Sequence, residues 1–183
     1  LSSAIVGQSD LRRIARPELE RLSDTVQETI NLSVMLEHDI FYLDKVETHR
    51  SVVCNTRVGS RAPAYATSGG KAMLACREPS EIDEYCRWMA QEACPLTSNT
   101  ITDPDRLRRE LSQARACGYA QDNGEIEEGL ICVAAPIYDM NHKAIAAVSV
   151  SGPDYRMKED QDVMIREVRQ TAAGISRLLG CRG

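Results

Sequence analysis

The residues best suited to chemistry lie in a glycine-bearing turn, Ala66-Thr-Ser-Gly-Gly-Lys-Ala-Met-Leu-Ala75, which leads into a helix-forming segment. Glycine followed by lysine at a helix start is typical of phosphate-binding loops. The P-loop pattern G-x-x-x-x-G-K-[ST] fails, because its first glycine falls on Tyr65 and no Ser or Thr follows the lysine. This excludes a nucleotide loop. Two interpretations remain: an anion site built from free backbone N–H groups around Ser68, Gly69 and Gly70, or a plain helix cap by Ser68.

Two hydroxyls and one thiol lie on segments that are expected to pair as strands. Ser149 and Ser151 end the small, apolar segment 144–151 on one face, and a buried hydroxyl needs a hydrogen-bond partner. That partner is either neighbouring backbone or a bound ligand. On the paired strand, Leu130 and Cys132 share one face. A nucleophilic Cys132 would need an adjacent histidine or cation, but the histidines lie beside predicted turns, so we expect Cys132 to form a wall of a core or pocket.

The charged residues near these segments give weaker signals. Residues 121–129 form an acidic loop without the spacing of a calcium loop, and such loops are usually exposed. Asp122 is nearest a strand, so it is the carboxylate expected to point inward and accept a hydrogen bond. Lys71, Arg57 and Arg61 are expected to be solvated or to attract anions, and none is placed as a general acid or base against a carboxylate.

The pattern of apolar residues predicts the elements that must position these groups. An amphipathic helix opens the chain and is interrupted or started at Pro17; further helices, strands and loops follow. The expected order is strands at 30–36, 40–46 and 51–54, a loop at 55–63, helices at 70–76, from 79 and at 104–117, strands from 119, at 130–138 and at 144–151, and a helix at 159–179. Strands that come in antiparallel groups predict an α+β fold with a central antiparallel sheet flanked by helices.

Composition limits the class of protein. The chain has 183 residues, enough for one domain, and its net charge of -5 argues against a DNA-gripping surface in this region. Seven cysteines, irregularly spaced and without C-x-x-C, favour a reduced, cytoplasmic protein and give no support for zinc or another metal. No cofactor and no membrane span are predicted. The chain begins with Leu1 instead of Met, which suggests a piece of a longer protein.

Taken together and in order, the motifs resemble those of IclR-type transcriptional regulators. The resemblance rests on residues 58–75 around the glycine turn, 118–122 and 129–139, 146–153, and the opening helix at 11–22. It implies a GAF-like effector-binding domain over residues 1–183, with 1–28 as the linker-proximal helix. It also implies an N-terminal winged helix-turn-helix, absent from these residues, that binds DNA as a homodimer or tetramer.

The resemblance further implies a pocket for a small-molecule effector and no enzymatic activity. Helix N–H groups and serines suit a carboxylate, so the predicted effector is a small organic acid, oxo- or hydroxy-substituted or aromatic. A serine at 68 and a glycine at 69, where relatives vary among small residues, could alter ligand choice. Rival interpretations are a GAF-like cysteine-based enzyme and a purely structural dimerisation module. The predicted effector-binding residues are Ser68, Gly69, Gly70, Asp122, Leu130, Cys132, Ser149, Ser151 and Val53.

Overall fold

A computed structural model describes residues 2–48, 50 and 56–182, with side chains from residue 7 onward. The elements alternate between helices and antiparallel strands, which confirms the α+β class. In chain order they are α1 (Ser2–Val26), β1 (Thr29–Leu36), β2 (Asp39–Val46), β3 (Arg61–Pro63), the 3-10 helix η1 (Ala64–Ala66), α2 (Ser68–Leu74), α3 (Pro79–Glu92), α4 (Pro104–Cys117), β4 (Ala120–Asn123), β5 (Leu130–Tyr138), β6 (Ala144–Pro153), α5 (Asp154–Glu159) and α6 (Gln161–Leu178).

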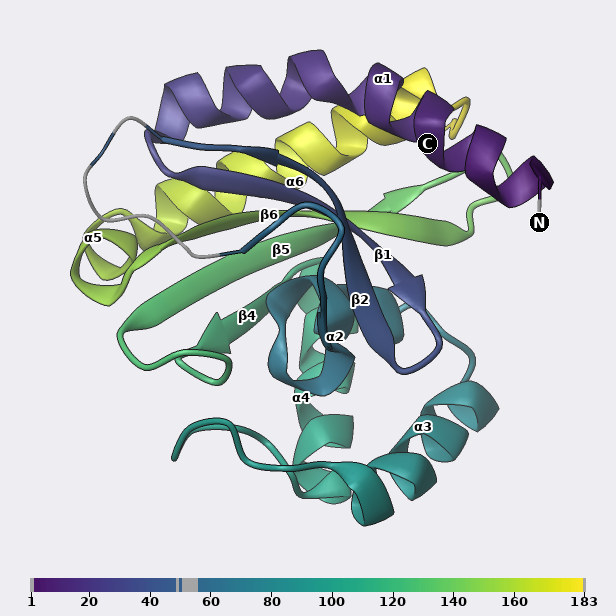
Figure 1. Cartoon of the computed structure of the whole chain (residues 1–183), viewed down its shortest axis with the longest axis vertical. Coiled ribbons are helices and arrows are strands. Elements are labelled where there is room, and N and C mark those ends of the chain that lie inside the picture. Colours follow the sequence, from purple (N-terminus) through teal and green to yellow (C-terminus); the bar gives the residue numbers. More distant parts are fainter. Residues whose placement is uncertain (1, 49, 51–55, 183) are drawn as a thin grey trace.

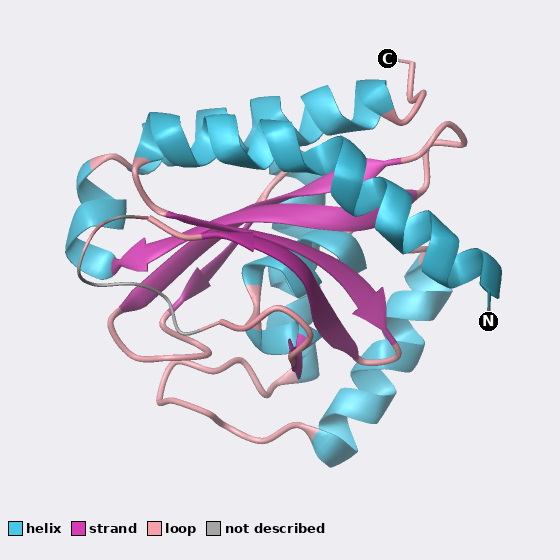
Figure 2. Ribbon diagram, turned by 45° about the horizontal axis from the view of Figure 1, so that its top comes forward, coloured by secondary structure: helices cyan, strands magenta, loops and turns pink. Residues whose placement is uncertain are grey.

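The sheet divides the molecule into two helical layers (Figure 1). Six strands lie in the order β3-β2-β1-β6-β5-β4, and every pair is antiparallel. Helices α1 and α6 pack together over one face, whereas α2, α3 and α4 lie on the other (Figure 2). Each face therefore has its own core. The first core contains Leu19, Leu32, Val148 and Val168, and the second contains Leu74, Met89, Leu107 and Ala147.

Most elements match the boundaries predicted from sequence. Both hairpins, the helices that start at Pro79 and Pro104, the Asp103 N-cap and the left-handed Gly118 (φ 76°) are confirmed. The short strand β3 falls inside a segment predicted to be a loop, and the last helix is preceded by the separate turn of helix α5. The predicted strand at 51–54 lies outside the described residues.

Helix α1 corrects the prediction that Pro17 interrupts or starts the opening helix. The helix runs through Pro17. Because proline has no backbone N–H, the hydrogen bond to the carbonyl of Arg13 is missing. Pro17 is exposed, so water can reach that carbonyl. Ala15 and Leu19, on either side of it, are fully buried against the sheet layer and hold the helix in place.

The strand register places the polar residues of interest side by side. Asp122 of β4 pairs with Cys132 of β5, which pairs in turn with Ser151 of β6. Ser149, two residues earlier on β6, pairs with Asn31 of the central strand β1. Directly opposed residues share a face of the sheet, so this row of side chains points toward α2.

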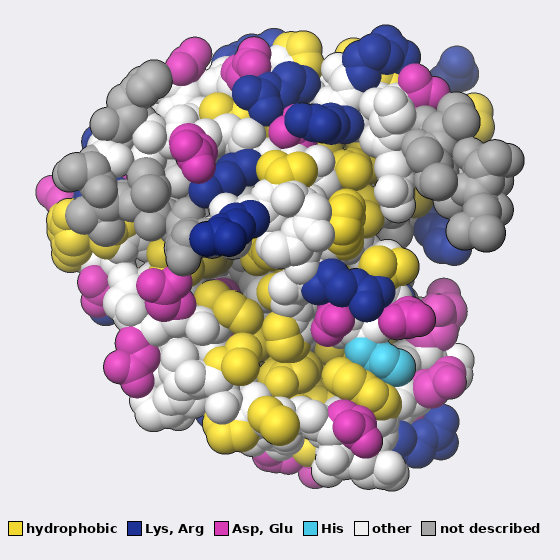
Figure 3. Space-filling view, in the orientation of Figure 1, with side chains coloured by type: hydrophobic (Ala, Val, Ile, Leu, Met, Phe, Trp, Pro, Cys, Tyr) yellow, Lys and Arg dark blue, Asp and Glu magenta, His cyan; other side chains and the backbone are white. Residues whose placement is uncertain are grey.

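The surface shows no single-sign charged face in the view of Figure 3, where acidic and basic side chains are interspersed. Hydrophobic side chains gather there over α2 and beside α3. Among the described residues, no helix is both long enough and apolar enough to cross a membrane.

Candidate functional site

A small cavity between the N-terminal end of α2 and the sheet brings together most of the predicted site residues. Seven of the nine predicted residues line this cavity, together with residues of β2 and of the 124–129 loop, and with Thr56 and Thr67. The full lining is Ile40, Tyr42, Thr56, Thr67, Ser68, Gly69, Asp122, Ile126, Leu130, Cys132, Ser149 and Ser151. Val53 lies outside the described residues. The cavity measures about 20 Å³, which is room for about one water molecule.

The glycine turn is divided between lining the cavity and packing. The N-cap of α2 is Thr67, not Ser68 as the helix-cap interpretation had it: the Thr67 hydroxyl accepts a hydrogen bond from the Gly70 N–H at 3.2 Å. The N–H groups of Ser68 and Gly69 belong to the first turn, where helix geometry supplies no carbonyl partner. Gly69 lines the cavity, whereas Gly70 does not. A Cβ on Gly70 would lie 2.3 Å from the carbonyl oxygen of Ala64, so this glycine permits close backbone packing.

Strand β1 contributes polar groups that sequence analysis missed. Thr29, Asn31 and Ser33 alternate with core residues and are all buried. Asn31 donates to the Ser151 hydroxyl at 3.4 Å and accepts from Thr56 at 2.8 Å. Every second residue of a strand that is otherwise apolar is polar here, and on an outer strand this pattern indicates a solvated face. In a central strand covered by α2, the same pattern places polar groups inside the protein; β1 does not line the cavity itself, but Asn31 bonds to two residues that do.

Behind the cavity lies a buried charge cluster. The Lys71 ammonium is fully buried and contacts Glu125 Oε1 at 2.6 Å, with Glu110 Oε2 at 3.8 Å. The prediction that Lys71 is solvated and unpaired with a carboxylate is therefore wrong. Glu125 was expected to share the exposure of its acidic loop, yet it is 4% exposed. Its pairing partner lies 54 positions away in the chain, which is why local sequence patterns miss the contact.

Asp122 points inward, as predicted, and its carboxylate is only partly satisfied. Oδ1 accepts a hydrogen bond from the Glu125 backbone N–H at 2.6 Å, and Oδ2 is buried without a partner among the described residues. Burial raises the pKa of Asp122 to about 7, because a charged carboxylate loses its hydration there; the Glu125 N–H and Lys71 oppose this shift. Near neutral pH, Asp122 can thus accept a hydrogen bond when ionised or donate one when protonated.

This pKa predicts how Asp122 contributes to stability. Between pH 4 and 7 the unfolded chain has Asp122 ionised while the folded protein keeps it protonated, so the stability contributed by Asp122 falls as pH rises. Asp122→Asn cannot titrate. Relative to wild type, its free energy of unfolding is expected to increase by about 4 kcal/mol from pH 4 to pH 8. Urea unfolding at several pH values measures this. Asp162→Asn, at an exposed position of α6, is the control, and an equal pH dependence in both variants would contradict the assignment.

Cys132 forms part of the cavity wall with Leu130 and Ile126, as the sequence predicted. It is 7% exposed, and no histidine is among the residues that line the cavity with it. In the described ranges, no group of three or more His, Cys, Asp or Glu side chains is arranged to hold a metal ion. The chemistry that the cavity offers is therefore hydrogen bonding to a small polar ligand from hydroxyls, a carboxyl and backbone N–H groups.

Comparison with known proteins gives consistent matches over almost the whole chain. The family model described as bacterial transcriptional regulator IclR C-terminal matches residues 3–177. The HTH-type transcriptional regulator BhcR of Paracoccus denitrificans is 37% identical over 179 residues, which cover 95% of this chain and 63% of BhcR. The chain spans about three fifths of the length of such curated relatives. These relatives are named as regulators, not as enzymes.

Solved structures agree with these matches. The structure of the transcriptional regulator YaiJ is 32% identical with a TM-score of 0.88, covering 93% of this chain and 96% of that chain. A homologue from Microbacterium hydrocarbonoxydans, solved in complex with 4-hydroxybenzoate, is 30% identical with a TM-score of 0.85, covering 94% of this chain and 69% of that chain. The similarity confirms the predicted GAF-like fold.

Proposed function

Because the chain belongs to the IclR family of bacterial transcriptional regulators and corresponds to the C-terminal, effector-binding domain of these proteins, we propose that the cavity beneath α2 binds a small organic acid that controls DNA binding. The supporting observation is convergence: Ser68, Asp122, Ser149 and Ser151 come from three separate segments and line one cavity. Together they supply three hydroxyls and one carboxyl. The DNA contact itself is assigned to an N-terminal winged helix-turn-helix domain in a dimer or tetramer.

The ligand class follows from the groups on offer. The N–H groups of Ser68 and Gly69 and the serine hydroxyls suit a carboxylate, and hydrogen bonds to a charged acceptor are stronger than neutral ones. Asp122 Oδ2, which has no partner among the described residues, suits a hydroxyl or a hydrated carbonyl of the ligand. Leu130, Cys132 and Ile126 would contact its carbon atoms. The complex of a homologue with 4-hydroxybenzoate, which carries a carboxylate and a hydroxyl, supports this class.

The size of the cavity bears on mechanism. At about 20 Å³ it is too small for an oxo acid, so binding must separate α2 or the 124–129 loop from the sheet. A ligand that fits only the widened form shifts the balance between two conformations by its difference in affinity for them. We propose that this widening favours one subunit arrangement and so changes the spacing of the DNA-binding domains.

Binding measurements test the proposal directly. Titration calorimetry with two- and three-carbon oxo acids, hydroxy acids and 4-hydroxybenzoate is expected to identify at least one ligand. Ser149→Ala should weaken its binding about 10-fold or more, because a hydrogen bond to a charged group is lost. Ser98→Ala, at an exposed loop position, should leave affinity unchanged. Binding of sugars or amines in place of acids, or equal affinity in the Ser149 variant, would contradict the proposal.

A further inference from the structure

A second and much larger cavity lies at the other end of α2. This groove measures about 570 Å³, within the range of roughly 300–1,000 Å³ that ligand sites occupy. It runs between the end of β1, the C-terminal end of α2, the start of α3 and the turn that joins β5 to β6. None of its lining residues belongs to the cavity beneath the N-terminal end of α2. The two sites are therefore separate.

The floor of the groove is apolar and adaptable. Met73 is 3% exposed, and Met35 and Ile145 are half-buried beside it. Thioether side chains are flexible and polarisable, so they fill space around apolar groups of different shape. This floor suits an aliphatic or aromatic side chain of a ligand.

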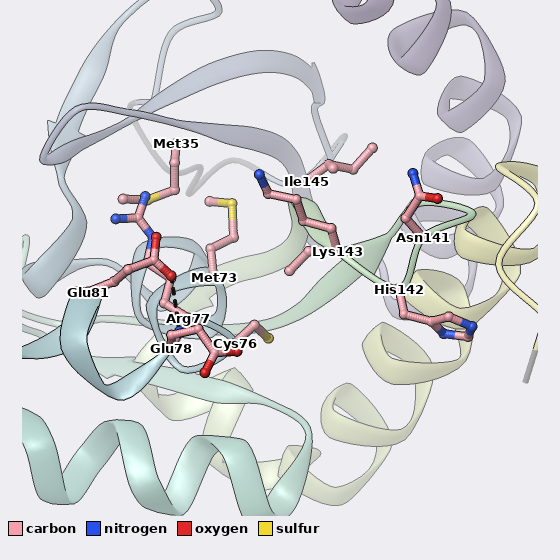
Figure 4. Close-up of a pocket in the computed structure, with 11 residues that line it drawn as sticks. Met35, Met73, Cys76, Arg77, Glu78, Glu81, Asn141, His142, Lys143 and Ile145 are labelled. Atoms are coloured by element: carbon pink, nitrogen blue, oxygen red, sulfur yellow. Dashed lines mark hydrogen bonds between the residues drawn. The ribbon is translucent and has the colours of Figure 1, made fainter.

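The rim of the groove carries both signs of charge. Arg77 extends from the end of α2 and Lys143 from the turn before β6, and Figure 4 shows the Met73 thioether between their charged groups. Neither side chain forms an ion pair or hydrogen bond with the described part of the protein. Glu78 and Glu81 lie on the side of α3; the Glu81 carboxylate accepts from the Glu78 N–H at 3.1 Å, which fixes its position.

We propose that this groove binds a zwitterionic α-amino acid with an apolar side chain. The ligand carboxylate would contact Arg77 and Lys143, its ammonium would contact Glu81 and Glu78, and its side chain would cover Met73. Two cations and two carboxylates leave the rim without net charge. A ligand with a single charge gains from one pair and is repelled by the other, whereas a zwitterion pairs with both.

Helix α2 connects this groove to the first cavity. Its seven residues span only about 10 Å, and all of them are buried. Ser68 and Gly69 at one end line the small cavity, while Met73 near the other end lines the groove. A ligand in the groove that displaces α2 therefore alters the first cavity, and linkage requires that the effect be reciprocal.

Calorimetric titration with L-leucine and two analogues tests the proposal. The analogues are 4-methylpentanoate, which lacks the amino group, and 3-methylbutylamine, which lacks the carboxylate. L-Leucine is expected to bind with a dissociation constant of about 1 mM or tighter, and each analogue about 10-fold more weakly. No heat of binding with leucine up to about 20 mM, or binding of either analogue as tight as leucine, would overturn the proposal.

Variants locate the site. Lys143→Gln and Arg77→Gln are each expected to weaken leucine binding about 5-fold or more, because they remove the partners of the carboxylate. Lys158→Gln, an exposed lysine of α5, and Ser149→Ala in the first cavity should leave it unchanged. Leucine binding that is lost in Ser149→Ala and kept in Lys143→Gln would assign the amino acid to the first cavity and reject the groove. Because leucine binding is measured with no organic acid present, this result does not depend on whether the first cavity binds one.

Discussion

Replacing Lys71 with methionine is expected to lower the free energy of unfolding by about 3–5 kcal/mol. The substitution leaves Glu125, whose side chain is 5% exposed, without the ammonium group 2.6 Å away. A buried carboxylate left without its cation keeps the cost of its lost hydration and has no opposing charge to offset it. Urea unfolding at pH 7 measures the loss, and Lys158→Met, at an exposed lysine, should change stability by less than about 1 kcal/mol.

Two further measurements separate the charge from the packing of Lys71. The double variant Lys71→Met, Glu125→Leu should recover most of the lost stability, because both buried charges are gone. Burial raises the pKa of Glu125, so its protonation in acid should also reduce the penalty of Lys71→Met as pH falls. A single variant as stable as wild type, or a double variant no better than the single one, would show that the ion pair does not hold this region together.

Gly70→Ala is expected to cost about 3 kcal/mol or more. Its Cβ would lie 2.3 Å from the oxygen and 2.4 Å from the Cα of Ala64, and both are backbone atoms that cannot rotate away. Overpacking in a rigid core typically costs about 1–3 kcal/mol, and here the backbone of η1 must move. Thermal unfolding measures the loss.

Gly7→Ala is the matched control for this substitution. Gly7 is also helical, but it is exposed and has open space where a Cβ would be. Alanine there should be neutral or stabilise the helix by up to about 1 kcal/mol, since glycine is the poorer helix former. Equal stability of Gly70→Ala and wild type would mean that α2 and η1 can separate at little cost.

The elements of the fold could be predicted because their signals are local. The short, mostly apolar runs at 130–138 and 144–151, the Asp103 cap and Gly118 each depend on neighbours in the chain. The prediction that Pro17 interrupts or starts the first helix was wrong, because the rule that proline breaks helices does not take the exposure of the residue into account. In α1 the freed carbonyl faces water, and buried neighbours hold the helix together.

The candidate site could be predicted only in part. Ser68, Asp122 and Ser149 were found through motif resemblance and strand alternation, and the structure places them at one cavity. Whether they bind an effector stays a prediction. Lys71 and Glu125 were misjudged because charge composition suggests exposure unless a partner is known, and their contact spans 54 positions. Likewise, nothing in the sequence of 29–33 indicates that α2 covers it.

The pairing of β1 with β6 has a consequence for how the protein is made. Asn31 and Ser151 form one contact across the central strands although 120 positions separate them, so one edge of β1 has no partner until β6 has been synthesised. Contacts this distant slow folding, and an unpaired strand edge invites association with other chains. Ser149 and Ser151, which line the small cavity, lie on this late strand. A nascent or truncated chain that ends before Ala144 lacks these residues and therefore cannot bind a ligand there. It also leaves one edge of β1 unpaired and open to association with other chains.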